Sequence, residues 1–152
     1  MKQHTHYNNA NGTGISGKHR SRIDRDNEFM KHYREVLDLM MEQGVPDARK
    51  AAIDFTVLNS RPHYHVSFDR AYVVVSKILN SSYHPAKPTL QTLMWNEIAD
   101  KVSQLIATKR LSIARALQFV LEHCRASRFF ISPQYAYFHL HPHKTFIKQN
   151  IL

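Results

Sequence analysis

The sequence predicts an all-α protein of about six helices. Apolar residues recur at spacings of three and four in successive stretches, which is the periodicity of helices with one buried face. Breaks that contain Gly, Pro and Ser separate these stretches, and residues that cap helices well follow the breaks. Of the 152 residues, 43% are apolar, so the chain can build a core for one ordinary domain or two very small ones.

The first 26 residues differ in composition from the rest of the chain. They combine Gly12, Gly14 and Gly17 with many Asn, Ser, Thr and basic residues. Such a mixture buries too little apolar surface to offset the entropy that is lost on ordering. We therefore predict a flexible basic arm over residues 1–26.

Residues 27–80 are predicted to form a first three-helix unit. Its first helix ends at Gly44, its second is capped by Asp47 and its third is capped by Ser67. The run 72–75 is rich in β-branched residues, so a short strand is the alternative there. The expected apolar faces are Phe29, Tyr33, Val36, Leu37 and Met40, then Ala48, Ala51, Ala52, Phe55 and Leu58, then Phe68, Ala71, Tyr72, Val75, Ile78 and Leu79.

Residues 81–89 contain two prolines and small polar residues, which predicts a linker before a second three-helix unit over residues 90–140. Ser112 caps its second helix, and Ser132 caps a short third helix. Residues 141–152 are a predicted tail. The expected apolar positions are Leu90, Leu93, Met94, Ile98, Val102, Leu105 and Ile106 with Trp95 on the flank, then Ile113, Leu117, Val120, Leu121 and a buried Cys124, then Tyr135, Ala136 and Phe138.

The two units contain stretches that follow one pattern. The first is ARKAAIDFTVLNSRPHYHVSFDRAY and the second is ARALQFVLEHCRASRFFISPQYAY. The match indicates either a pseudo-repeat or two uses of the same connection. Where the first stretch has His63-Tyr64-His65, the second has Arg128-Phe129-Phe130, so the scaffold does not need the histidines. This favours a structural interpretation, in which an aromatic ring from each connection inserts between helices.

A formal net charge of +9 favours polyanionic partners, nucleic acid before a membrane surface and DNA before RNA. The chain has no phosphate-binding Gly-rich loop, nucleophile elbow or paired carboxylates, which predicts a binding protein without catalysis or cofactor. Helix-turn-helix geometry is a loose fit, with Asp69, Arg70, Ser76 and Lys77 as exposed candidates. The expected nucleic-acid-binding residues are Lys18, Arg20, Arg22, Arg25, Arg49, Lys50, Arg61, Arg70, Lys77, Lys109, Arg110, Arg115, Arg125 and Arg128.

Three alternatives remain open at this point. The charges can form a solvated face without a partner. The helix over residues 90–106, with Trp95, can pack on another protein or on a second copy, as in an interaction module or a homo-oligomer.

The absence of a long apolar run and of a signal-peptide block predicts a cytoplasmic protein without a membrane partner.

The third alternative is metal chemistry at the histidines. The stretch RPHYHV resembles the His-hydrophobe-His signature of replication and mobilisation endonucleases, which implies His63 and His65 as ligands of a divalent cation and Tyr72 as the nucleophile in DNA nicking. The preceding segment reads as helix where that family has sheet, and the stretch lacks an acidic third ligand. Other candidate metal ligands are His139, His141 and His143, and His4 with His6.

The stretch over residues 61–71, Arg-Pro-x-Tyr-x-Val-Ser-Phe-x-x-Ala, also resembles a loop and helix of small uncharacterised bacterial proteins, often found with mobile elements in gut Bacteroidetes. The resemblance implies a bacterial cytoplasmic protein. It assigns no catalytic residue.

Overall fold

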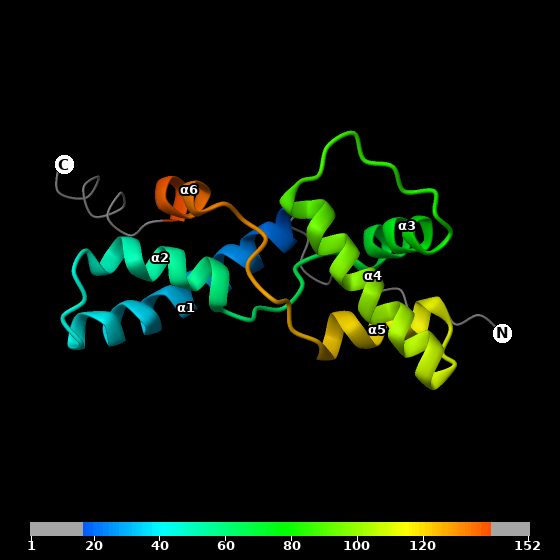
Figure 1. The fold of residues 1–152 in the computed structure, drawn as a ribbon, viewed down its shortest axis with the longest axis horizontal. Helices are drawn as coiled ribbons and strands as arrows, with labels where there is room; N and C mark the ends of the chain where they lie inside the picture. Colours follow the sequence, from blue (N-terminus) through cyan, green and yellow to red (C-terminus); the bar gives the residue numbers. More distant parts are fainter. Residues whose placement is uncertain (1–16, 141–152) are drawn as a thin grey trace, which may run out of the picture.

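The computed structural model describes residues 17–140, with side chains from residue 21 onward. This part is helical and contains no β-strand, which confirms the all-α prediction and the helix over residues 72–75 (Figure 1). No helix among these residues has the length and apolar character that crossing a bilayer requires. The elements are α1 (Gly17–Glu42), α2 (Ala48–Asn59), α3 (Phe68–Leu79), α4 (Leu90–Lys109), α5 (Ile113–His123) and α6 (Pro133–Tyr135), which continues as the π-helix η1 (Ala136–Leu140).

Most helix starts follow the predicted capping. The hydroxyl oxygens of Ser67, Ser112 and Ser132 each accept a hydrogen bond from the backbone N–H three residues later, at 3.2, 3.2 and 3.0 Å. Asp47 is the exception, because it takes the left-handed conformation, with φ 47°, and makes no side-chain cap. After α1, Gly44 reverses the chain at φ 68°, a conformation that glycine adopts without strain.

The helices group in an order that the sequence pattern does not predict. One buried cluster joins α1, α2, α6 and η1, and we call these elements the first unit. The other joins α3, α4 and α5, which we call the second unit. Each predicted unit of consecutive helices has therefore exchanged its last helix with the other, so that α3 packs on α4 and α5 while α6 packs on α2.

The two connections explain this exchange. Residues 60–67 leave α2 and residues 124–132 leave α5 without helical structure, and their first residues are extended, with ψ 145° at Ser60 and 150° at Cys124. An extended residue advances the chain by about 3.3 Å, so each connection starts by leading away from the helix that precedes it. The second connection contacts the first connection and the end of α2 where the two units join: the Ala126 N–H donates to the Pro62 carbonyl at 2.7 Å, and the Phe129 N–H donates to the Val57 carbonyl of α2 at 3.0 Å.

An aromatic ring from each connection fills the unit that receives the following helix. Tyr64 is 5% exposed in the second unit, where the Lys101 ammonium lies 5.0 Å from the centre of its ring. Phe129 is 1% exposed in the first unit, where it packs edge-on against Phe29 at 5.3 Å. The prediction that these rings insert between helices is confirmed for Tyr64 and Phe129.

Each unit also holds the base of a connection with a glutamate of its long helix, in both cases the residue directly before a buried position, Phe29 in α1 and Ile98 in α4. Glu28 in α1 accepts a hydrogen bond from the His63 N–H at 2.9 Å. Glu97 in α4 accepts one from the Ser127 N–H at 3.1 Å. These matched contacts extend the similarity of the two halves beyond the aligned stretches.

In several helices the buried face differs from the predicted apolar face. Phe55 and Leu58 of α2, and Phe68 and Tyr72 of α3, are exposed, and so is Leu93 of α4. The small or β-branched residues beside them are buried instead, because they let the neighbouring helices approach closely. Trp95 is buried rather than flanking, because α4 is covered on two sides by α3 and α5. Cys124 is only partly buried, at the end of α5. The buried residues are Ala52, Ile53, Thr56 and Val57 in α2 and Ala71, Val74 and Val75 in α3.

The flexible arm predicted for residues 1–26 is wrong from Gly17 onward, where α1 begins. The segment is held by a residue far along the chain: the Tyr135 hydroxyl donates to Asp26 Oδ2 at 3.0 Å, and the Arg25 guanidinium lies 5.1 Å from the centre of the Tyr135 ring. Local composition cannot reveal such a contact, because its partner is separated by 109 residues. Residues 1–16 and the predicted tail over 141–152 lie outside the described residues.

Candidate functional site between the two helical units

An open cleft of about 770 Å³ lies where the two units meet. It is formed by the first part of α1, by both connections, by the start of α3 and by the start of α4. We call it the inter-unit cleft. Because both connections cross at this place, the exchange of helices also creates the cleft. Its lining residues are Ser21, Arg22, Arg25, Pro62, His63, Tyr64, His65, Val66, Ser67, Arg70, Gln91, Met94, Trp95, Ala126, Arg128, Phe129 and Phe130.

Four arginines give the inter-unit cleft its charge: Arg22, Arg25, Arg70 and Arg128. No Asp or Glu belongs to the described residues that line it. The Arg128 guanidinium is held in place, because Nε donates to the Phe129 carbonyl at 3.0 Å and Nη2 to the Ile131 carbonyl at 3.3 Å. Arg25 is also held, by an ion pair with Asp26 at 2.9 Å. Arg70 is exposed at the start of α3.

The side chains that α1 and α4 contribute to the lining of the cleft differ in character. From α1 come Arg22 and Arg25, whereas α4 contributes Met94 and Trp95. Phe130, from the second connection, adds a partly buried ring. The cleft therefore combines cations with apolar and aromatic surface. Binding sites for nucleic acids and nucleotides have the same combination.

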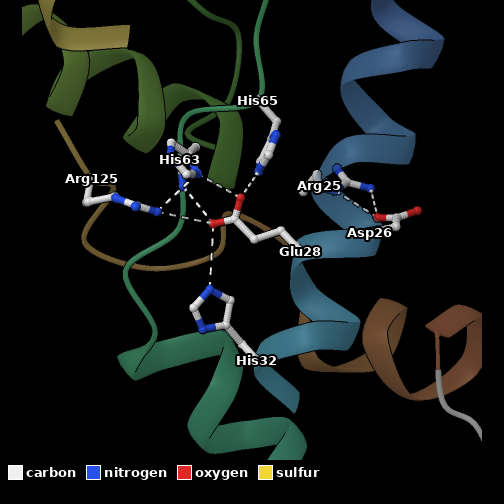
Figure 2. A network of polar contacts seen from close by, with 7 residues as sticks. All are labelled: Arg25, Asp26, Glu28, His32, His63, His65 and Arg125. Atoms are coloured by element: carbon white, nitrogen blue, oxygen red, sulfur yellow. Dashed lines mark hydrogen bonds and ion pairs between the residues drawn. The ribbon is translucent and has the colours of Figure 1, made fainter. Parts of the chain in front are cut away.

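A carboxylate lies behind the histidines of the cleft. Glu28 Oε1 accepts the His63 N–H, and Glu28 Oε2 lies 3.0 Å from His63 Nδ1 and 2.9 Å from His65 Nε2 (Figure 2). The side chains of Glu28 and His65 are each 14% exposed. Their hydrogen bonds are thus shielded from water, and they fix the first connection to α1.

Two more basic side chains lie near the same carboxylate. Arg125 Nη1, from the second connection, lies 3.8 Å from Glu28 Oε1 and 3.0 Å from His63 Nδ1, and His32 Nε2 lies 3.7 Å from Glu28 Oε1 (Figure 2). We assign the proton of the His63 ring to Nδ1, because the carboxylate can only accept a hydrogen bond, so Nδ1 donates to Glu28 and accepts no hydrogen bond from the nearby Arg125 guanidinium. Glu28 therefore joins α1 to both connections.

The surroundings shift the ionisation of this cluster. Burial raises the pKa of Glu28, but the hydrogen bonds from His63 and the charges of the histidines outweigh it, so that the pKa lies below its ordinary value of 4.5. Burial lowers the pKa of His65 from its ordinary value of 6.5, and Glu28 offsets part of this effect. At neutral pH, Glu28 is ionised and a neutral His65 donates its Nε2–H.

The spacing of the two histidines has a structural consequence in this connection. Alternate residues of an extended segment point to the same side, so His63 and His65 can share one partner. In the structure that partner is the Glu28 carboxylate, and no group of three or more His, Cys, Asp or Glu among the described residues is placed to hold a metal ion. The described residues also lack the sheet that the endonuclease resemblance implies.

The other metal and nucleophile candidates lie elsewhere. Tyr72 is exposed on α3 and stacks on Phe68 at 6.0 Å. His139, in η1, is exposed and lies 4.9 Å from the centre of the Tyr135 ring. Further histidine candidates fall outside the described residues, namely His4, His6, His141 and His143.

Among the side chains that the structure describes, four of the predicted nucleic-acid-binding residues line the cleft. Arg125 contacts Glu28 behind it, and Arg61 is exposed on the first connection. The side chains of Lys18 and Arg20 are outside the description, although both residues belong to α1. The remaining candidates lie at the ends of helices: Arg49 and Lys50 at the start of α2, Lys77 at the end of α3, Lys109 and Arg110 at the end of α4, and Arg115 at the start of α5.

Sequence reasoning did not assign Glu28 or Phe130 to the site and expected Trp95 on an outer flank. Glu28 meets residues that are 35 and 37 positions away, so no local pattern identifies it. With this geometry established, comparisons with protein-family models, with curated proteins and with solved structures find no match.

Proposed function

We propose that the protein binds nucleic acid, DNA in the first place, in the inter-unit cleft and without catalysis. The observation that supports this proposal is the set of four arginines on a lining without carboxylates, beside apolar and aromatic surface. The net charge of +9 adds long-range attraction for a polyanion.

The charge and the geometry of the arginine side chains suit phosphate recognition. A guanidinium donates in a planar fork that matches two phosphate oxygens, and it stays charged at every physiological pH. Arg128 is already fixed by two backbone carbonyls, so less side-chain entropy is lost when a phosphate binds there. Arg70 is exposed and can reach toward a strand at the rim.

The test is a titration of labelled DNA oligonucleotides, followed by fluorescence anisotropy at several salt concentrations between roughly 50 and 200 mM. Arg25 is already paired with Asp26, so if the other three arginines neutralise three phosphates, the plot of log affinity against log salt has a slope of about −2 for a single strand or about −3 for a duplex. An affinity that does not change with salt contradicts the proposal.

A second candidate function is self-assembly through apolar side chains. Phe55 and Leu58 on α2 are exposed, as are Tyr137 and Phe138 on η1, and α2 packs against η1. Exposed aromatic residues are enriched at protein interfaces. Oligomers that persist at high salt in sedimentation velocity support this function, whereas a monomer at every salt concentration contradicts it.

A further inference from the structure

We infer that the inter-unit cleft selects single-stranded nucleic acid over duplex, with phosphates on the arginines of α1 and a base face on Phe130 of the second connection. The inference rests on the proposed function and names its substrate class. It follows from the different side chains that line the cleft, namely cations from α1 and one accessible aromatic ring from the second connection.

The matched positions carry opposite chemistry. Glu28 and Glu97 hold the two connections in the same way, and the residues one turn before them line the cleft. On α1 this turn presents the cation of Arg25, whereas on α4 it holds the apolar side chains of Met94 and Trp95, which are 9% and 5% exposed. The α1 part of the lining therefore suits a phosphate, and the α4 part forms the uncharged floor beside it.

Of the two forms of DNA, the single strand offers both kinds of surface to so small a site. A duplex turns its charged phosphates outward and keeps the faces of its bases stacked inside, so it has little to place against the ring of Phe130. The volume of about 770 Å³ falls within the range of roughly 300–1,000 Å³ of small-ligand pockets, which suits a few nucleotides and not the body of a duplex. Base stacking on aromatic rings is the usual source of affinity for single strands.

Phe130 is the aromatic ring best placed for stacking. Tyr64, Trp95 and Phe129 also line the cleft, but each is at most 5% exposed. Phe130 is only partly buried, so it retains surface that a base can cover. Trp95, the only tryptophan of the chain, lies in the same lining and reports on its occupation.

The experiment uses the full chain, with short oligo(dT) and the duplex of oligo(dT) with oligo(dA) as probes. Anisotropy gives the two affinities, and Trp95 emission reports on the cleft. We expect about tenfold tighter binding of the single strand, with quenching of Trp95 by that strand alone. Phe130→Leu, which keeps an apolar side chain, is expected to weaken single-strand binding roughly fivefold or more and to leave duplex binding unchanged.

Phe119→Leu is the matched control, because Phe119 is 45% exposed on α5 and does not line the cleft. Circular dichroism of both variants establishes that they are folded, and the comparison of probes on the wild type needs no variant. Equal, salt-dependent binding of both probes overturns this inference and leaves the proposed function standing. Failure to bind either probe overturns both. A single-strand preference that Phe130→Leu leaves intact overturns the stacking role of Phe130.

Discussion

Replacing Phe129 with alanine is expected to lower the free energy of unfolding by about 3–5 kcal/mol, the usual cost of removing a buried phenylalanine ring. Phe129 is 1% exposed and packs against Phe29 at 5.3 Å and His32 at 5.9 Å. Alanine leaves a cavity there, because the Phe129 N–H is fixed to the Val57 carbonyl and the backbone cannot move in to fill the space.

Urea denaturation followed by circular dichroism measures this loss. Phe119→Ala removes the same ring from an exposed position and is expected to cost about 1 kcal/mol or less. If the two variants lose equal stability, the second connection does not anchor the first unit as the structure indicates.

Replacing Glu28 with glutamine is expected to lower the free energy of unfolding at neutral pH by roughly 2–3 kcal/mol, because hydrogen bonds to a charged partner are worth more than neutral ones. Three N–H donors point at this carboxylate. Two belong to His63, its backbone N–H and its ring N–H, and the third is the ring N–H of His65. A glutamine oxygen can accept two of them, and the amide N–H₂ would then face a donor.

The pH dependence of the free energy of unfolding is a second test of the role of Glu28. The pKa of His65 is lowered in the folded protein, so the unfolded chain binds a proton more readily as the pH falls below about 6.5, and stability decreases. The pKa of Glu28 is lowered too, so its contribution is present above about 4.5 and is lost as the pH falls further. The second decrease should be smaller in Glu28→Gln, which no longer carries the titrating group.

Glu35→Gln serves as the control for both measurements, since Glu35 is exposed on the same helix. Its expected effect at neutral pH is within about 0.5 kcal/mol. Wild-type stability between pH 4.5 and 3.5 that falls no more than in Glu28→Gln contradicts the role of Glu28.

The helices themselves could be predicted from the sequence because their signals are local. Ser67, Ser112 and Ser132 cap helices through bonds to a backbone N–H only three residues later, and Gly44 ends the turn after α1 in a left-handed conformation that favours glycine. Such contacts are set by a few neighbouring residues. The periodicity of the apolar residues then places the helices correctly, although it does not fix which side of α2 or α3 is buried.

The grouping of the helices could not be predicted in the same way. It depends on the direction in which residues 60–67 and 124–132 run and on the hydrogen bonds between them, such as Ala126 N–H to the Pro62 carbonyl. The candidate site shares this difficulty. Net charge drew attention to the arginines, four of which line the cleft, but the carboxylate behind the histidines and the apolar lining from α4 come from parts of the chain that meet only after folding.

The most direct test of the central claim, that cleft arginines bind nucleic acid, compares two charge reversals. One variant carries Arg22→Glu and Arg70→Glu in the cleft, and the other carries Arg34→Glu and Arg115→Glu at exposed positions outside it. Both change the net charge equally. The account predicts that the cleft variant loses at least about tenfold in oligonucleotide affinity and that its salt slope shrinks by about 1.4, while the control stays close to wild type. Equal losses in the two variants would contradict it, since the charge would then act through the overall field and not through this site.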